Sequence, residues 1–255
     1  MELGVQIYTV REHTKDEAGL ERAFERIRGI GYRTLEGAGL SRFPAERVGE
    51  LAQKHDLRIA ADHVGIKDLM DDIDVVIERH RLWKTEALII PALDEATYLN
   101  AEGLAKLADL LPEIAARLKE AGMQLGYHNH HFEFKHIDGR TVLEALYKIV
   151  PAEVLKAELD VHWVVRGGGD PVSWIRRLAG RQPTIHLKDF AVGLDSEARH
   201  APVGEGNMNF PAIIQAAREA GVRYGFVEQD DAYGEDPFDC LERSYRHLNT
   251  TFGLQ

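Results

Sequence analysis

Metal-binding residue types at the ends of short, mainly apolar segments are the clearest sign of chemistry in this chain. Asp160, His186 and Glu228 each lie at or near the end of such a segment. Two carboxylates and one imidazole suit a divalent ion such as Mn²⁺, Co²⁺, Zn²⁺ or Fe²⁺. The three residues are far apart in the sequence, so they form one site only if the fold brings the ends of their segments together.

A fourth metal ligand is expected from the segment Gln124–His130. With the two-residue period of a strand, His128 and His130 lie on the same face of this segment. Their residue type leaves two roles open, because either imidazole can complete the metal site or orient the substrate. Glu133, just beyond the segment, is a competing oxygen donor.

The polar residues of the other segments also share one face of each predicted strand. Glu158, Asp160 and His162 lie on one side of their segment. His186 and Lys188 do the same in theirs, and the opposite faces are apolar. We therefore expect the apolar side chains to pack outward against helices and the polar side chains to converge inward on an active site.

This arrangement requires strands that alternate with helices around a closed sheet. Helical patterns separate the strand-like runs, and eight such units in 255 residues predict an α/β fold, a single-domain (β/α)8 TIM barrel over residues 1–255. A doubly wound open sheet would be expected to carry a glycine-rich loop after its first strand, but Arg11–Thr14 contains no glycine. The predicted strands lie near residues 3–8, 33–38, 58–63, 86–92, 123–130, 156–162, 183–189 and 223–228.

Composition limits the classes of protein that the chain can belong to. A hydrophobic content of 44% supports one large core, and the single cysteine, Cys240, excludes a disulfide framework. No apolar run reaches membrane-spanning length, so we expect a cytoplasmic protein with no membrane partner. A net charge of −11 argues against a nucleic-acid partner. The oligomeric state stays open, a homo-oligomer included.

Further polar groups at or near strand ends predict substrate contacts. Hydrogen-bonding groups gathered around a metal suggest a polyhydroxylated small molecule, such as a sugar or a cyclitol. Arg166, Lys188 and Arg199 are the candidates for binding an anionic substituent. The other predicted substrate contacts are Gln6, Tyr8, Glu36, His63 and His162.

Taken together, several segments resemble the sugar isomerase/epimerase superfamily of xylose-isomerase-like barrels, which includes inosose dehydratases, dehydroshikimate dehydratases and endonuclease IV. The resemblance implies one divalent metal held by Asp160, His186, Glu228 and an acidic residue of the fifth strand. His128 stands at that acidic position, so we assign it as the fourth ligand. The segments are Leu3–Val10, Tyr127–Phe134, Asp160–Trp163 with Arg166–Pro171, His186–Asp189, His200–Gly206 and the strand ending in Glu228.

The resemblance also implies a reaction class. In the keto-sugar epimerases of the superfamily, two metal-bound glutamates exchange a proton on opposite faces of an enediolate. Here only Glu228 keeps that role, and His130 or Lys188 is expected as its acid partner. The expected function is a metal-dependent isomerase or epimerase acting on a keto-sugar or cyclitol. A dehydratase (lyase) is the alternative, because one carboxylate with histidines and a lysine also suits β-elimination.

Two other functions are weaker readings of the same residues. Endonuclease IV shares the pattern His186-x-x-Asp189 and a segment like His200–Gly206, but its Asp-Arg-His metal motif here begins with Ala198. We therefore expect His200 and its loop to form a substrate wall without a second metal. A sugar-binding protein without catalysis would need neither a metal nor converging acid and base groups.

Overall fold

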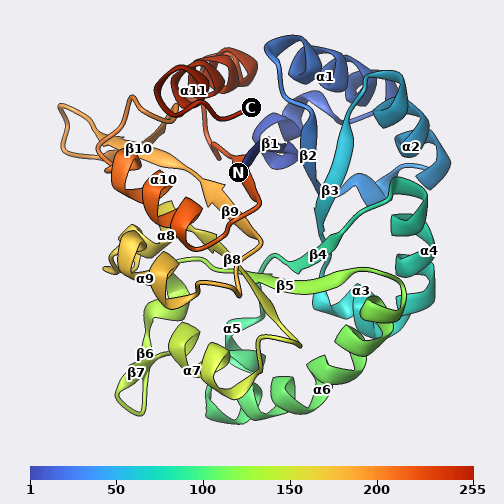
Figure 1. The fold of residues 1–255 in the computed structure, drawn as a ribbon, viewed down its shortest axis with the longest axis vertical. Coiled ribbons are helices and arrows are strands. Elements are labelled where there is room, and N and C mark those ends of the chain that lie inside the picture. Colours follow the sequence, from blue (N-terminus) through green and yellow to red (C-terminus); the bar gives the residue numbers. More distant parts are fainter.

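A computed structural model describes residues 1–255, and its eight main strands form a closed parallel barrel (Figure 1). The strand order around the barrel is β1-β12-β9-β8-β5-β4-β3-β2. The predicted (β/α)8 barrel is therefore confirmed, and the open doubly wound sheet is excluded. The barrel strands are β1 (Glu2–Gln6), β2 (Thr34–Ala38), β3 (Arg58–His63), β4 (Ala87–Ile90), β5 (Gln124–His128), β8 (Lys156–Asp160), β9 (Thr184–Leu187) and β12 (Tyr224–Val227).

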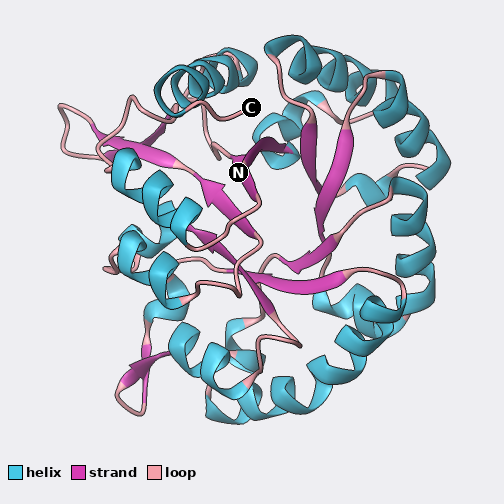
Figure 2. Ribbon diagram, viewed as in Figure 1, coloured by secondary structure: helices cyan, strands magenta, loops and turns pink.

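Helices surround the barrel on its outside (Figure 2). They bury apolar faces against the strands, as Leu20, Phe24 and Ile27 do in the first helix. None of them combines the length and the apolar character needed to cross a membrane. The helices are α1 (Glu17–Ile30), α2 (Ala45–Lys54), α3 (Ile66–Asp71), α4 (Ile73–Trp83), α5 (Glu95–Tyr98), α6 (Ala101–Glu120), α7 (Val142–Ile149), α8 (Val161–Arg166), α9 (Pro171–Arg177), α10 (Phe210–Glu219) and α11 (Pro237–Phe252).

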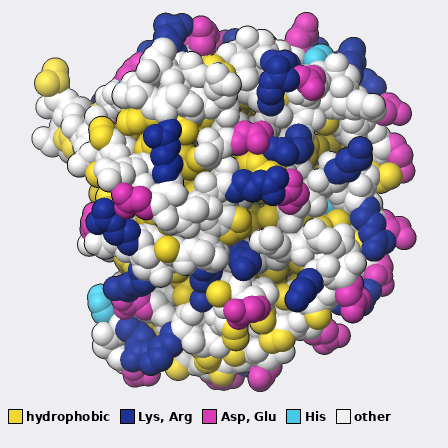
Figure 3. Space-filling view, viewed as in Figure 1, with side chains coloured by type: hydrophobic (Ala, Val, Ile, Leu, Met, Phe, Trp, Pro, Cys, Tyr) yellow, Lys and Arg dark blue, Asp and Glu magenta, His cyan; other side chains and the backbone are white.

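Short elements decorate the connections between strands and helices. Three 3₁₀ helices follow β1, β2 and β5, namely η1 (Ile7–His13), η2 (Leu40–Arg42) and η3 (Phe132–Phe134). Two antiparallel hairpins pair β6 (His136–Ile137) with β7 (Arg140–Thr141), and β10 (Asp189–Val192) with β11 (Ala198–Ala201). Acidic and basic side chains are interspersed over the face of the molecule in Figure 3, with no large area of one sign.

Several strands end earlier than the sequence predicted. Tyr8 lies in η1, and His130 lies beyond the end of β5. His162 lies in α8, because the Asp160 side chain accepts a hydrogen bond from the backbone N–H of Trp163 and starts the helix there. The predicted strands 3–8, 123–130 and 156–162 were therefore too long, and His162, predicted to face inward, lies in the helix instead.

The barrel interior changes from apolar to polar along its axis. Ala61, Ile89, Tyr224 and Phe226 belong to a small apolar cluster inside the barrel. Charged residues follow it toward the carboxyl ends of the strands, with Glu158 and His186 both fully buried. Catalytic sites of TIM barrels lie at this carboxyl end. The apolar cluster fills the barrel at the other end, so the polar site can be reached only from the carboxyl end.

Gly4 makes room for the apolar cluster, and its replacement tests this packing. A Cβ at Gly4 would lie 2.5 Å from Cδ1 of Phe226 and 2.9 Å from the backbone oxygen of Thr34. We expect Gly4→Ala to lower the free energy of unfolding by about 1–3 kcal/mol, measured by urea denaturation. Gly29→Ala is the matched control, because nothing lies within 4 Å of a Cβ there and alanine favours the helix. Equal stability of the two variants would contradict this account of the barrel interior.

Candidate active site and metal centre

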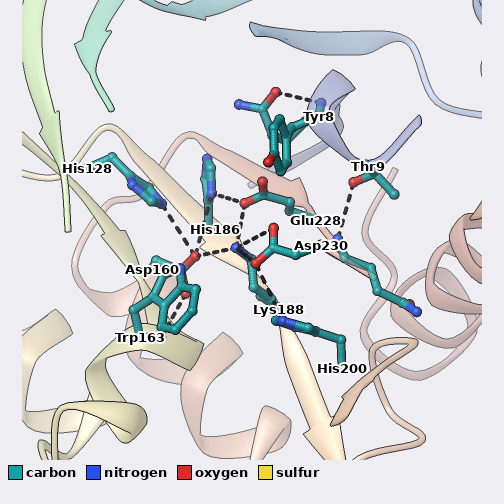
Figure 4. A network of polar contacts seen from close by, with 12 residues as sticks. Tyr8, Thr9, His128, Asp160, Trp163, His186, Lys188, His200, Glu228 and Asp230 are labelled. Atoms are coloured by element: carbon teal, nitrogen blue, oxygen red, sulfur yellow. Dashed lines mark hydrogen bonds and ion pairs between the residues drawn. The ribbon is translucent and has the colours of Figure 1, made fainter. Parts of the chain in front are cut away.

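Four residues predicted as metal ligands converge at the carboxyl ends of the barrel strands (Figure 4). One ligand atom from each of His128, Asp160, His186 and Glu228 lies within 4.8 Å of the others, and all four residues are buried. His186 Nδ1 is 2.8 Å from Glu228 Oε2, and His128 Nε2 is 3.4 Å from Asp160 Oδ2. Two imidazoles and two carboxylates at this spacing fit a single divalent ion of the Mn²⁺, Fe²⁺, Co²⁺ or Zn²⁺ type.

The two ring nitrogens of His186 face different partners. Nδ1 faces Glu228, whereas Nε2 lies 2.5 Å from Glu36 Oε2 and 3.1 Å from Glu158 Oε1. Burial alone lowers the pKa of His186, but the carboxylates of Glu158, Glu36 and Glu228 outweigh it and raise the pKa well above its usual value. A metal would therefore bind Nδ1, while the proton on Nε2 is donated to the carboxylates beneath.

A second layer of polar residues lies beneath the ligand set. Glu36 and Glu158 are fully buried, and Gln6 Nε2 donates a hydrogen bond of 2.8 Å to Glu36 Oε2. Burial, together with the charge of Glu158, raises the pKa of Glu36 to about 8. His63 Nε2 lies 3.0 Å from Glu158 Oε1 and connects this layer with the space above. Gln6 and Glu36, predicted as substrate contacts, therefore support His186 from below and do not line the substrate cavity.

Replacing Glu158 tests the supporting role of this layer. Glu158→Gln keeps the shape of the side chain but removes the charge that holds the Nε2 proton of His186. We expect the metal affinity to fall by about 10–100-fold while the barrel stays folded, measured by competition with a chelator. Glu153→Gln, at an exposed position, is the control for the charge change. Wild-type affinity in Glu158→Gln would show that the lower layer does not act on the metal site.

A cavity of about 710 Å³ opens above the ligand set. Six predicted site residues line it: Tyr8, His63, His128, His130, Lys188 and Glu228. Five further polar or aromatic residues that the sequence reasoning missed also line it, namely Arg11, Glu12, Arg42, Trp163 and Asp230. Only Asp230 had a readable signal, because it lies two residues beyond Glu228 and continues the inward period of β12. The others lie in the 3₁₀ helices η1 and η2 and in α8, where strand periodicity gives no guide.

Lys188 is held among carboxylates on the cavity floor (Figure 4). Its Nζ lies 2.8 Å from Glu228 Oε2, 3.1 Å from Asp160 Oδ2 and 3.0 Å from Asp230 Oδ2. Burial lowers the pKa of Lys188, but the three carboxylates outweigh it and raise the pKa above its usual value. The side chain is therefore a charged ammonium group, able to donate a proton beside Glu228.

His130 is a neutral imidazole in the cavity wall. Burial, together with nearby His128, lowers the pKa of His130 to about 3. Its ring stacks on Phe132 with centroids 5.1 Å apart, and its buried Nδ1 has no hydrogen-bond partner. Of the two predicted acid partners of Glu228, Lys188 thus carries the proton at neutral pH, and His130 can bind a substrate hydroxyl group.

Glu133 is not a metal ligand in this arrangement. Its Oε1 accepts a hydrogen bond from the Tyr127 hydroxyl group, and its Oε2 accepts one of 2.9 Å from the backbone N–H of His130. Burial raises the pKa of Glu133 to about 7. Its carboxylate therefore orients the segment after β5, and it is His128 from this part of the chain that joins the candidate metal group.

Three further predicted substrate contacts, besides Gln6 and Glu36, do not line the cavity. His162 and His200 lie against one another with ring centroids 4.6 Å apart, and His200 Nε2 is 3.5 Å from Asp230 Oδ2. Arg166 is exposed at the end of α8. The sequence prediction placed His162 on the inward face of a strand, but the chain turns into a helix at Asp160. The two histidines instead support the cavity wall from behind, and no candidate metal group includes His200.

Asp189 organises the loop that follows the β10–β11 hairpin. Its carboxylate accepts hydrogen bonds from the backbone N–H groups of Phe190, Gly204, Gly206 and Met208. Gly206 is required there, because a Cβ would lie 2.2 Å from Asp189 Oδ1. The pattern shared with endonuclease IV thus has a structural use in this chain, namely holding the loop beside His200.

The fold and the position of the cavity, at the carboxyl ends of eight parallel strands, define a TIM barrel of the type that carries enzymes. The chain belongs to the xylose isomerase-like TIM barrel family, whose model matches residues 24–232. Proteins to which the chain is similar include an inosose dehydratase, and structures of the same fold include a sugar phosphate isomerase/epimerase and an AP endonuclease of family 2. The resemblance drawn from the sequence segments is thereby confirmed.

Individual relatives are distant. The chain is 24% identical over 179 residues to an inosose dehydratase of Lacticaseibacillus casei, covering 63% of this chain and 59% of that protein. It thus spans less than two thirds of that relative's length. A sugar phosphate isomerase/epimerase from Parabacteroides distasonis has the same fold, with a TM-score of 0.83, 23% identity and coverage of 100% of this chain and 95% of that one.

A further structure of the same fold contains a metal. The IolI protein, with a bound zinc atom, superposes with a TM-score of 0.75 and 16% identity, covering 98% of this chain and 97% of that one. At this identity the likeness shows the fold alone. A metal site in this chain is therefore inferred from its own converging side chains.

Proposed function

We propose that this protein is a divalent-metal-dependent enzyme that removes a proton next to the carbonyl group of a keto-sugar or keto-cyclitol. The observation that carries the proposal is the convergence of His128, Asp160, His186 and Glu228 on the floor of a polar cavity. When bound, the metal would polarise the carbonyl group and stabilise the negative charge that develops on its oxygen. The inosose dehydratase and the sugar isomerase/epimerase relatives support the substrate class.

The residues on the cavity floor divide the proton transfers between them. Glu228 is the carboxylate that would accept the proton from carbon, since it lines the cavity and lies beside the other ligands. Lys188 holds a transferable proton 2.8 Å away from it. His130 and His63, which also line the cavity, would bind hydroxyl groups and hold the substrate in place.

This division favours dehydration by β-elimination. Glu228 takes the proton, the electrons of the C–H bond form a double bond, and the C–O bond of the neighbouring hydroxyl group breaks. The leaving hydroxide receives a proton from Lys188 and departs as water. Both groups lie on one side of the cavity floor, as an elimination from one face of the substrate requires.

Isomerisation or epimerisation is the second candidate, and two observations support it. His128 and His130 line the same cavity as Glu228 and come from the end of β5, which β8 and β9 separate from β12 in the barrel. An imidazole in that position could return the proton to another atom or to the other face of the substrate. The isomerase/epimerase from Parabacteroides distasonis shares the fold over the whole of this chain.

Proton NMR in D₂O distinguishes these outcomes. The protein, loaded in turn with Mn²⁺, Co²⁺, Zn²⁺ or Fe²⁺, is incubated with a panel of keto-sugars and inososes. A dehydrated product is expected, and reversible proton removal would place deuterium next to the carbonyl group of the recovered substrate. Exchange and rearrangement without water loss would instead support isomerisation or epimerisation. Neither exchange nor product with any metal would contradict the proposed function.

A further inference from the structure

Two arginine side chains line the cavity at its mouth, away from the ligand set. Arg11 belongs to η1, after β1, and Arg42 belongs to η2, after β2. The one acidic residue beside them in the lining, Glu12, is paired with Lys15 at 2.7 Å. The carboxylates of Glu228 and Asp230 lie on the floor instead, where Lys188 pairs with both. The cavity therefore has a carboxylate-rich floor and a cationic rim.

Neutral oxygens hold both guanidinium groups in place. Arg11 donates to the backbone oxygens of Tyr8 and Asp230, at 3.0 and 2.8 Å, and lies over the Tyr8 ring, 4.2 Å from its centroid. Arg42 donates to the backbone oxygen and, at 3.0 Å, to the hydroxyl group of Thr14. These bonds fix the orientation of the two groups, but they do not neutralise their charge and use only part of their five donors.

The arginines that the sequence suggested for an anion do not reach the cavity. Arg166 is exposed at the end of α8, and Arg199 is paired with Asp195. Lys188 is already surrounded by three carboxylates. Among the cationic side chains of the cavity, only Arg11 and Arg42 have charge left for a ligand.

We propose that the substrate carries an anionic oxygen group, a phosphate or a carboxylate, which Arg11 and Arg42 bind at the cavity mouth. This inference rests on the proposed function, because it takes the carbonyl end of the substrate to lie on the ligand set. The opposite end then faces the rim. Guanidinium groups match the geometry of both anions through paired N–H donors, and such charge-assisted bonds are stronger than neutral ones. The substrate class becomes a keto-sugar or keto-cyclitol with an acidic substituent remote from the carbonyl group.

A binding experiment tests the rim without any turnover. Inorganic phosphate and acetate are titrated into the full-length protein by calorimetry, as probes of the two anion types. Arg42→Gln and, separately, Arg11→Gln should weaken binding of the preferred probe about tenfold or more. Arg81→Gln is the matched control, because Arg81 is exposed on the outer helix α4 and its loss removes the same charge. Equal binding by wild type and both rim variants would overturn the proposal.

Arg42→Gln also separates a loss of anion binding from a loss of correct folding. Arg11 holds the backbone of Asp230, so its loss can disturb the floor as well as the rim. Arg42 hydrogen-bonds Thr14 and lies over the Phe43 ring, and neither residue lines the cavity, so its loss leaves the floor intact. A wild-type unfolding midpoint together with weakened anion binding in Arg42→Gln supports the proposal. Wild-type anion binding in this variant counts against it.

A kinetic comparison separates this inference from the proposed function. Each keto-sugar that shows proton exchange is compared with its terminal phosphate ester and its terminal carboxylate. We expect one anionic form to have a kcat/KM at least about tenfold higher than the neutral sugar, an advantage that Arg42→Gln removes and the control Arg81→Gln keeps. Exchange with equal kcat/KM for all forms would overturn the anion site and leave the proposed function standing. Arginine-dependent phosphate binding without exchange on any form would support the anion site and reject the proposed chemistry.

Discussion

Glu228→Gln is expected to lose both the metal and the reaction. The substitution keeps the shape of the side chain but removes one of two charged ligands and the proposed base. It also removes the negative charge that lies 2.8 Å from both His186 Nδ1 and Lys188 Nζ. Since a positioned base contributes about 10²–10⁴-fold to rate, proton exchange should fall by at least about 10³-fold when the effect on the metal is added. Elemental analysis and the D₂O assay measure the two losses.

His186→Ala should lose the metal by a different route. The imidazole is the neutral ligand that also partners Glu36 and Glu158, so its removal leaves two buried carboxylates without their principal partner. Thermal unfolding should therefore shift downward in this variant, but not in Glu228→Gln to the same degree. Glu78→Gln, at an exposed position of α4, is the control for both. Full stoichiometric metal in both Glu228→Gln and His186→Ala would place the metal elsewhere.

The strand period placed Asp160, His186 and Glu228 on the inward faces of their segments, whereas the choice of His128 over His130 came from the family resemblance. Side chains alternate strictly along a strand, so Glu158 and Asp160 had to share the face opposite Leu159, whatever the fold. The barrel then required that face to point inward, because helices cover the outside. His186 and Glu228 followed by the same reasoning from β9 and the end of β12. This part of the site is determined by local geometry and one topological step.

The ends of the strands could not be read in the same way. His162 continues the inward period of its segment, but the Asp160 side chain caps a helix and turns the chain away. Tyr8 also leaves its strand, but unlike His162 it lines the cavity. It leaves β1 for a 3₁₀ helix and still reaches the cavity, because Gln6 Oε1 accepts a hydrogen bond from its backbone N–H. Side-chain bonds to the backbone decide these turns, and a period of two carries no information about them.

The rim of the cavity depended on tertiary contacts between loops. Arg11 reaches the cavity because it binds the backbone oxygen of Asp230, a residue more than two hundred positions away. Arg42 is placed by Thr14 in the same manner. Arg166, which follows a recognisable motif, points to solvent instead. Residue type alone therefore suggested that an arginine would bind an anion, but only the packing of the loops shows which one can.

His128 has the hydrogen bonding of a neutral metal ligand. Its Nδ1 lies 3.1 Å from the backbone oxygen of Pro91, which accepts the ring proton, so that Nε2 presents its lone pair toward Asp160. Burial, together with His186, lowers the pKa of His128 and keeps the ring neutral. An imidazole at this position in place of a carboxylate raises the charge of the metal site by one unit. A bound metal would then polarise the carbonyl group of the substrate more strongly, and one potential carboxylate base is absent.

His128→Glu should therefore restore a second base while keeping the metal. We expect the ratio of deuterium exchange to dehydration, measured by NMR on recovered substrate and product, to rise at least about tenfold. The new carboxylate would be buried near Asp160 and Glu228, so the unfolding temperature of the variant should also depend more strongly on added metal than that of the wild type. His136→Glu, at an exposed position of β6, is the matched control.

His128→Ala decides whether this residue is a ligand at all. Removing the imidazole leaves three protein ligands, a set that still binds a divalent ion but more weakly. We expect a clear loss of metal affinity in chelator competition, with the remaining activity recovered at high metal concentration. If His128 only lined the cavity, its loss would leave the metal affinity unchanged, since His63 and His130 would still line it. Unchanged metal affinity and unchanged rate in His128→Ala would therefore show that His128 is not a ligand. The higher charge that His128 gives the metal site could then no longer be a reason to favour elimination.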